Sequence, residues 1–215
     1  MRKIPLTTNQ IYHIFNRGVN KNDIFFSQKD YNRFLAAAKH YIIKNSKFSY
    51  EKSPVDNNEA NDPVSLASGP KIEILAYCLM PNHFHFLIKQ LIDSGITMYM
   101  RRFMNSYVHY VNVKNKRLGP LFQGRFKNVL VGSDEQLLHV SRYIHLNPLV
   151  SNLVANLDDY PWSSYLTYTS SAEDRFISPQ IISNMFKKKR DYKKFILDQE
   201  DYAKSLEQLK HLEDF

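Results

Sequence analysis

The chain has 215 residues, 43% of them hydrophobic and 13% aromatic, which excludes a disordered chain and allows a substantial core. Lysine and arginine outnumber aspartate and glutamate 29 to 21, and the resulting charge of +8 favours an anionic partner, nucleic acid first. One cysteine excludes a disulfide framework and a cysteine zinc cluster. Without a hydrophobic leader or a bilayer-length apolar run, we expect a cytoplasmic protein with no membrane partner, nucleoid-associated when bound to DNA.

The predicted elements alternate in the order strand, helix, strand, strand, helix, strand, helix. Residues 47–70 lack periodicity and are interpreted as an inserted loop. Alternation, helical spacing and capping residues predict strands at Ile11–Arg17, Lys71–Tyr77, from His83 onward and at Phe126–Val131, and helices at about Ser27–Asn45, Ser94–Asn115 and Ser133–Asn147. The last helix is expected to end near Asn147, because Pro148 disfavours helical geometry in the residue before it.

This order is closed most compactly by a four-stranded antiparallel sheet with two helices on one face, an α+β ferredoxin-like fold. The other face would carry the histidines of the third strand, with the extra helix nearby. Residues 1–150 are then expected to form a catalytic domain that includes the inserted loop, and residues 151–215 a partly helical C-terminal extension. In that extension, Tyr160–Tyr165 is interpreted as a packing anchor. The basic run Lys187–Arg190 is interpreted as solvated surface, with DNA contact the alternative.

Two histidines stand out at the start of the third predicted strand. His83 and His85 follow the turn-forming pair Pro81–Asn82 and are two residues apart. Because side chains on a strand alternate, both imidazoles project from one face, while Phe84 and Phe86 point to the core. A rigid strand end can hold two metal ligands in fixed geometry, although a His-x-His pair can equally be structural.

A row of polar side chains lies along the last predicted helix, where His139, Tyr143 and Asn147 recur every four residues. A divalent cation held by His83 and His85 would polarise a scissile phosphate, and Tyr143 could then attack phosphorus to form a phosphotyrosine. Asn147 is the expected third ligand, with His139 the rival. This ligand set suits Mg²⁺ or Mn²⁺, and the two imidazoles favour Mn²⁺. The alternative is that the row of side chains on the helix is only a partly buried polar edge.

Candidate nucleic-acid contacts come from three parts of the chain. Residues 117–127 interleave basic and aromatic residues around two glycines, which is typical of a loop approaching a nucleic-acid backbone, although a tight turn with incidental charge is the alternative. Two arginines on the polar side of helix 94–115 are either solvated or bind phosphate. With one arginine of the first strand, the candidates are Arg17, Arg101, Arg102, Arg117, Gln123, Arg125 and Lys127.

Several motifs together resemble those of a known family, the single-tyrosine transposases of the His-hydrophobic-His superfamily, and most closely the REP-associated branch. The resemblance covers about residues 5–168 and leaves out the inserted loop and the tail. It rests on three motifs in the right order, Met80–Leu87 (MPNHFHFL), Arg142–Pro148 (RYIHLNP) and Tyr160–Tyr165 (YPWSSY), supported by Tyr12–Gly18 and Gly119–Phe126.

The resemblance implies an enzyme that cuts and rejoins single-stranded DNA near small hairpins, either REP-like or at transposon ends. By this resemblance, His83 and His85 are the paired metal ligands and Tyr143 is the nucleophile that becomes joined to a 5′ phosphate. Asn147 corresponds to the third ligand, which is glutamine in some relatives. The phosphotyrosine would conserve the bond energy. Relatives work as dimers or as monomers, so a homodimer is one of two expected states.

Two other functions fit the same residues. A ferredoxin-like module could bind single-stranded nucleic acid without chemistry, with Tyr143 as a stacking or packing residue. A metal-dependent phosphodiesterase could use water as its nucleophile and would form no covalent adduct. A decayed transposase is a further alternative, although every proposed catalytic residue is present.

Overall fold

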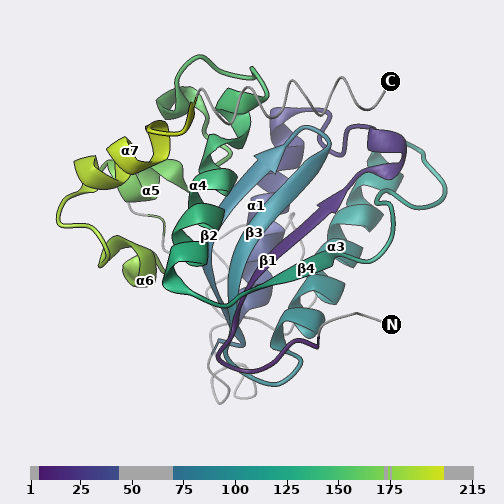
Figure 1. Cartoon of the computed structure of the whole chain (residues 1–215). Coiled ribbons are helices and arrows are strands. Elements are labelled where there is room, and N and C mark those ends of the chain that lie inside the picture. The colour runs from purple at the N-terminus through teal and green to yellow at the C-terminus, as the bar shows by residue number, and fades with distance from the viewer. Residues whose placement is uncertain (1–4, 44–69, 172–173, 175, 201–215) are drawn as a thin grey trace, which may run out of the picture.

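A computed structural model of the chain describes residues 5–43, 70–171, 174 and 176–200. All of the inserted loop predicted at 47–70 except its last residue lies outside these ranges, as do residues 201–215. Within the described ranges, a single sheet separates a layer of two helices from a layer that contains one long helix and the C-terminal extension (Figure 1).

The four strands form an antiparallel sheet in the order β2-β3-β1-β4. This order confirms the predicted ferredoxin-like fold. Strand β2 ends three residues later than predicted, because the hairpin turn needs only Pro81 and Asn82, so that Met80 pairs directly with His83. The strands are β1 (Ile11–Arg17), β2 (Ile72–Met80), β3 (His83–Gln90) and β4 (Lys127–Val131).

Two helices, α1 (Gln28–Ile43) and α3 (Gly95–Lys114), cover one face of the sheet (Figure 1). The even-numbered side chains of β1 and β3 point at them, as the predicted alternation requires. Phe34 of α1 is at the centre of this core. Its ring centroid lies 5.3 Å from that of Phe84 and 4.5 Å from that of Phe103.

The helix α4 (Asp134–Val150) runs across the opposite face (Figure 1). It begins after Ser133, whose Oγ accepts a hydrogen bond from the backbone N–H of Gln136 at 3.2 Å, as the capping pattern predicts. In a full capping box the side chain three residues later would accept from the N–H of the cap residue, and here it does not. The Gln136 side chain accepts from the backbone N–H of Gly132 at 2.8 Å, one residue before the cap.

The predicted end of this helix at Asn147 is wrong, because α4 continues through Pro148 to Val150. Proline costs a helix one backbone hydrogen bond and crowds the preceding turn. At Pro148 that cost falls within the last turn. Ser151, the first residue after the helix, still caps it by donating its N–H to the carbonyl of Asn147 at 3.0 Å.

The C-terminal extension covers the outer edge of β2. The Leu79 N–H donates to the Trp162 carbonyl at 2.9 Å, and the Ser164 N–H donates to the Tyr77 carbonyl at 3.0 Å, so this segment continues the sheet. The indole of Trp162 stacks on Tyr31 with centroids 4.6 Å apart, which confirms the predicted packing anchor. The short helices are η1 (Val19–Lys21) and, in the extension, η3 (Leu157–Asp159), α5 (Tyr165–Thr169), α6 (Gln180–Ser183) and α7 (Lys189–Leu197).

Replacing Phe34 by alanine should lower the free energy of unfolding by about 3–5 kcal/mol, because it leaves a cavity between α1, α3 and the sheet. Urea titration followed by circular dichroism measures this loss. The matched control is Phe26→Ala, since Phe26 is 51% exposed and its loss should change the free energy by no more than about 0.5 kcal/mol. Equal effects of the two changes would contradict the placement of the core.

Candidate functional site

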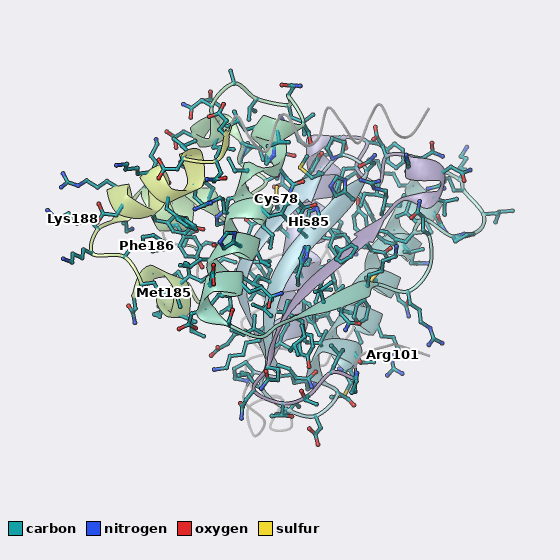
Figure 2. All side chains as sticks on the ribbon, in the orientation of Figure 1. Cys78, His85, Arg101, Met185, Phe186 and Lys188 are labelled. Atoms are coloured by element: carbon teal, nitrogen blue, oxygen red, sulfur yellow. The ribbon has the colours of Figure 1, made fainter. Side chains whose placement is uncertain are left out.

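The open face of the sheet and α4 enclose a hollow of about 610 Å³. His83, His85 and Tyr143, the three predicted catalytic residues, all line it. Figure 2 shows His85 over the sheet, beside α4. Other side chains in the wall that bear on its chemistry are His13, Arg17, Gln123, Lys127 and His139.

The pairing of β1 with β3 decides which side chains meet in the hollow. Arg17 is directly opposite His83, and Phe15 is opposite His85. Since both strands alternate, the odd-numbered side chains of each face the same side. His13 lies diagonally from His85, and its Nε2 is 2.9 Å from the Nδ1 of that ring. The imidazole centroids of His83 and His85 are 4.9 Å apart.

Tyr143 lies on α4 and faces these histidines. Its ring centroid lies 5.3 Å from that of His85 and 5.8 Å from that of His13. The Tyr143 side chain is 47% exposed, so an incoming strand can reach it. The structure therefore brings a phenol and two imidazoles to one accessible place within a single chain.

The two candidates for a third ligand have different surroundings. The Asn147 side chain acts on that of His83 and raises its pKa, and its Nδ2 donates to the Tyr143 carbonyl at 2.7 Å. His139 is exposed on the same helix, with its Nε2 4.0 Å from a carboxylate oxygen of Glu135. Of the two, Asn147 is the residue in contact with one of the paired histidines.

Burial keeps the imidazoles neutral. Burial lowers the pKa of His83 to about 4, the charge of Arg17 lowers it further, and the hydrogen bond with Asn147 opposes this shift. Burial also lowers the pKa of His13 to about 4. Burial, together with the neighbouring His83, His13 and Arg17, holds the pKa of His85 well below its usual range. A neutral imidazole has the lone pair that metal ligation requires.

These residues fit a divalent cation. The Nε2 of His85 is buried and has no hydrogen-bond partner in the described structure, as expected of an atom reserved for a ligand. Among the described residues, no group of three histidine, cysteine or acidic side chains is arranged to hold a metal ion. Further ligands would therefore come from an amide such as Asn147, from water or from DNA.

The candidate DNA contacts divide by position. Arg17, Gln123 and Lys127 line the hollow, and the Gln123 N–H donates to the Arg17 carbonyl at 2.9 Å, which holds the loop beside β1. Arg125 is exposed in the same loop and does not line the hollow. Arg117 lies at the far end of the loop, tied by its N–H to the end of α3.

Arg101 and Arg102 are not brought to the hollow. Both lie on α3, whose buried Phe103 packs against Phe34 and Phe86 on the other side of the sheet. Figure 2 shows Arg101 well away from His85. Any contact of these two arginines with DNA would be made outside the hollow, and their predicted role stays a prediction.

Sequence reasoning missed His13. The alternation of the first strand does place it on the same face as Arg17. Its contact with His85, however, depends on the register between strands that are 72 residues apart in the sequence. A pattern within one strand carries no information on that register.

Comparison with known proteins agrees with this site. Residues 44–147 match the family described as transposase, IS200-like. These residues are similar to the IS200-like transposases over just under half of the chain. The match confirms the resemblance predicted from the motifs, and it supports a transposase-like DNA-binding function. No curated protein matches the chain. In the described part of the chain, no helix is long and apolar enough to cross a membrane.

The transposase fold is also that of a solved structure described as a REP-associated tyrosine transposase bound to a REP hairpin. The TM-score is 0.54 at 17% sequence identity, and the alignment covers 83% of this chain and 98% of that one. At this identity the likeness supports the fold and leaves the roles of single residues to the geometry.

A relay of buried hydrogen bonds connects α4, the helix that carries Tyr143, to the C-terminal extension. His145, two residues after Tyr143, places its Nδ1 2.7 Å from the Tyr192 hydroxyl of α7 and its Nε2 2.8 Å from the Ser164 Oγ. Ser164 Oγ in turn accepts from the Tyr77 N–H of β2 at 2.8 Å. Burial lowers the pKa of His145 to about 3, so the relay contains a neutral imidazole.

This relay should make the fold sensitive to acid. In the unfolded chain His145 takes up a proton near pH 6.5, whereas in the folded chain its pKa is about 3. Stability is therefore intact above pH 6.5 and is lost as the pH falls toward 3. His145→Gln, which can still hydrogen-bond, should remove about 2 kcal/mol of the loss between pH 7 and pH 5.

Urea titrations of the wild type and the variant at both pH values measure this difference. Other buried histidines contribute equally to both proteins and cancel. The control is His139→Gln, an exposed histidine on the same helix, which should leave the acid dependence unchanged. A variant as acid-sensitive as the wild type would show that His145 is not the buried neutral group.

Proposed function

We propose that the chain is a divalent-metal-dependent, single-tyrosine transposase that cuts and rejoins single-stranded DNA through a covalent 5′-phosphotyrosine. The observation that carries this proposal is the position of Tyr143, with its ring 5.3 Å from His85 in a hollow open to solvent. A module that only binds DNA has no need of a phenol beside paired neutral imidazoles. The match of residues 44–147 to the IS200-like transposase family supports the same function.

His83 and His85 would hold the cation, with Asn147 as the third ligand. Mg²⁺ and Mn²⁺ both accept an amide oxygen, and the two imidazoles favour Mn²⁺. When bound, the cation polarises the scissile phosphate and neutralises charge that develops on it. Arg17, opposite His83, would add a guanidinium to the same phosphate oxygens.

In the proposed step, the Tyr143 oxygen loses its proton and attacks phosphorus. The bond between phosphorus and the 3′ oxygen breaks, and the 3′ oxygen takes up a proton and leaves as a hydroxyl. The 5′ phosphate stays on the tyrosine. Attack by another 3′ hydroxyl reverses the step and joins a new strand, so one phosphodiester is exchanged for another without an external energy source.

The proposed substrate is single-stranded DNA beside a hairpin, REP-like or from a transposon end. The solved relative was captured with a REP hairpin, and the hollow here is lined by Gln123 and Lys127, which can contact phosphate and base edges. Arg125 would extend this contact outside the hollow. Tyr143 and His85 come from the same chain, so one subunit has the residues for cleavage, and a homodimer remains a prediction.

Tyr143→Phe should abolish the covalent protein–DNA adduct while leaving DNA affinity within about threefold, because affinity comes mainly from phosphate contacts. The substrate is a pool of single strands with one hairpin and randomised flanks, incubated with Mn²⁺ and resolved on a denaturing gel. A 5′-phosphotyrosine retains the 3′ fragment, so only strands labelled at their 3′ end should stay on the protein.

The control is Tyr41→Phe, which changes a tyrosine of α1 on the other side of the sheet and should leave the adduct intact. An adduct formed by Tyr143→Phe would overturn the nucleophile assignment. Cleavage with free 5′ phosphates and no adduct would identify a phosphodiesterase that uses water. Binding with neither product would identify a non-catalytic module.

Binding of Mn²⁺ should be nearly independent of pH between 7.5 and 5.5. Histidines with the ordinary pKa would be roughly nine-tenths protonated at pH 5.5 and would lose affinity, whereas His83 has a pKa of about 4 and stays neutral. Calorimetry should give dissociation constants within about threefold across this range. His83→Ala should weaken binding by at least about 100-fold, more than the loss of an outer partner.

A loss of affinity that begins near pH 6.5 would contradict the neutral state of these ligands. DNA binding, measured without metal, should survive His83→Ala. Equal loss of metal and DNA affinity would instead show that His83 is structural.

A further inference from the structure

Each of the paired histidines has its Nδ1 engaged by a neighbouring side chain. The Nδ1 of His83 is 2.6 Å from the Oδ1 of Asn82, and the Nδ1 of His85 is 2.9 Å from the Nε2 of His13. In both rings the Nε2 is therefore the nitrogen that this partner leaves open, although in His83 the Asn147 side chain also acts on the ring. A neutral imidazole carries a hydrogen on only one of its two nitrogens. The partner at Nδ1 therefore decides whether Nε2 carries a lone pair or a hydrogen.

For His83 the hydrogen-bond network fixes the answer. The Nδ2 of Asn82 donates to the Lys21 carbonyl at 2.9 Å, so the amide oxygen is the atom that faces His83. An amide oxygen only accepts, and the hydrogen in this contact must come from the Nδ1 of His83. The Asn82 backbone is also held, since the Gly18 N–H donates to its carbonyl at 2.8 Å.

For His85 the same result follows from burial. The ring is 4% exposed, and its Nε2 has no hydrogen-bond partner in the described structure. A hydrogen on that atom would be a buried donor with nothing to accept it. With the hydrogen on Nδ1 and donated to His13, the Nε2 keeps a lone pair, which a cation can use.

We propose that Asn82 and His13 are positioning residues that hold His83 and His85 in the tautomer whose Nε2 lone pair faces the cation. This inference rests on the proposed metal-dependent function and deepens it. It also assigns His13, in the wall of the hollow, a supporting role. The Nε2 of His13 accepts the hydrogen of His85, so His13 orients a ligand and is not itself the third one. Partners of this kind fix the ring orientation and raise ligand basicity.

The direct test is the tautomer in the metal-free protein, read from long-range ¹⁵N–¹H correlation spectra of the histidine rings, with signals assigned by single substitutions. In the wild type both rings should carry the hydrogen on Nδ1. His13→Phe removes the acceptor and should shift His85 toward the Nε2–H form. His13→Gln, whose side-chain oxygen reaches about as far as the imidazole Nε2, should restore the wild-type pattern.

Mn²⁺ affinity, measured by calorimetry, should follow the tautomer. His13→Phe should weaken binding about 10- to 100-fold, and His13→Gln should stay within a few-fold of the wild type. The control His109→Gln changes an exposed histidine of α3 and should alter neither measurement. If His13→Phe does not fold, His13→Asn, whose amide is too short to reach His85, should give the same loss.

Asn82 offers a parallel pair. Asn82→Ala should shift His83 alone toward the Nε2–H form, whereas Asn82→Asp keeps an acceptor oxygen and should hold the wild-type form. A wild-type His85 that carries its hydrogen on Nε2, or a folded His13→Phe or His13→Asn with an unchanged tautomer, would overturn the proposal. The spectra need no metal. Failure of the protein to bind Mn²⁺ would therefore refute the proposed function, while the tautomers could still be measured.

Discussion

The antiparallel register between β1 and β3 is the constraint on which the rest of the site depends. It places Arg17 opposite His83 and allows His13 to reach His85. A shift of one residue would turn every side chain of β1 to the other face, so the same slip would expose Tyr12 and Ile14, which are now fully buried. The core under α1 and α3 therefore secures the polar face above it.

The helix α4, which carries Tyr143, depends on a second set of contacts. Tyr143 is exposed and contributes little to its own placement, whereas His145 on the other side of α4 is buried and bonded to Ser164 and Tyr192. Two of the sequence motifs, which contain His145 and Ser164, thus meet inside the protein. Their contact fixes the helix that carries Tyr143 against the segment beyond the sheet.

Much of this was predictable because it is local. Period-two alternation separates His83 and His85 from Phe84 in the sequence alone, and four-residue spacing aligns Tyr143 with Asn147. Capping residues located the start of α4. The role of each of these residues as ligand or nucleophile is a chemical expectation that the geometry permits, and that covalent trapping decides.

What the sequence did not reveal is non-local. The contact of His13 with His85 and the bond from His145 to Tyr192 join residues 72 and 47 positions apart. The helix α4 continues past the predicted end at Asn147, because the restriction that Pro148 places on the residue before it does not break a helix in its last turn. Arg101 and Arg102 are candidate contacts because they are charged and lie on the polar side of their helix, and neither property says which side of the sheet that helix covers.

The covered edge of β2 limits how this protein can associate. Its outward carbonyls are taken, that of Leu79 by the Tyr160 hydroxyl at 2.6 Å and that of Leu75 by the Tyr168 hydroxyl at 2.6 Å. In the described part of the chain, β4 is the edge strand with no further strand beside it. A partner that docks by β-augmentation would therefore add to β4, next to Lys127 at the mouth of the hollow, where it would compete for space with the DNA.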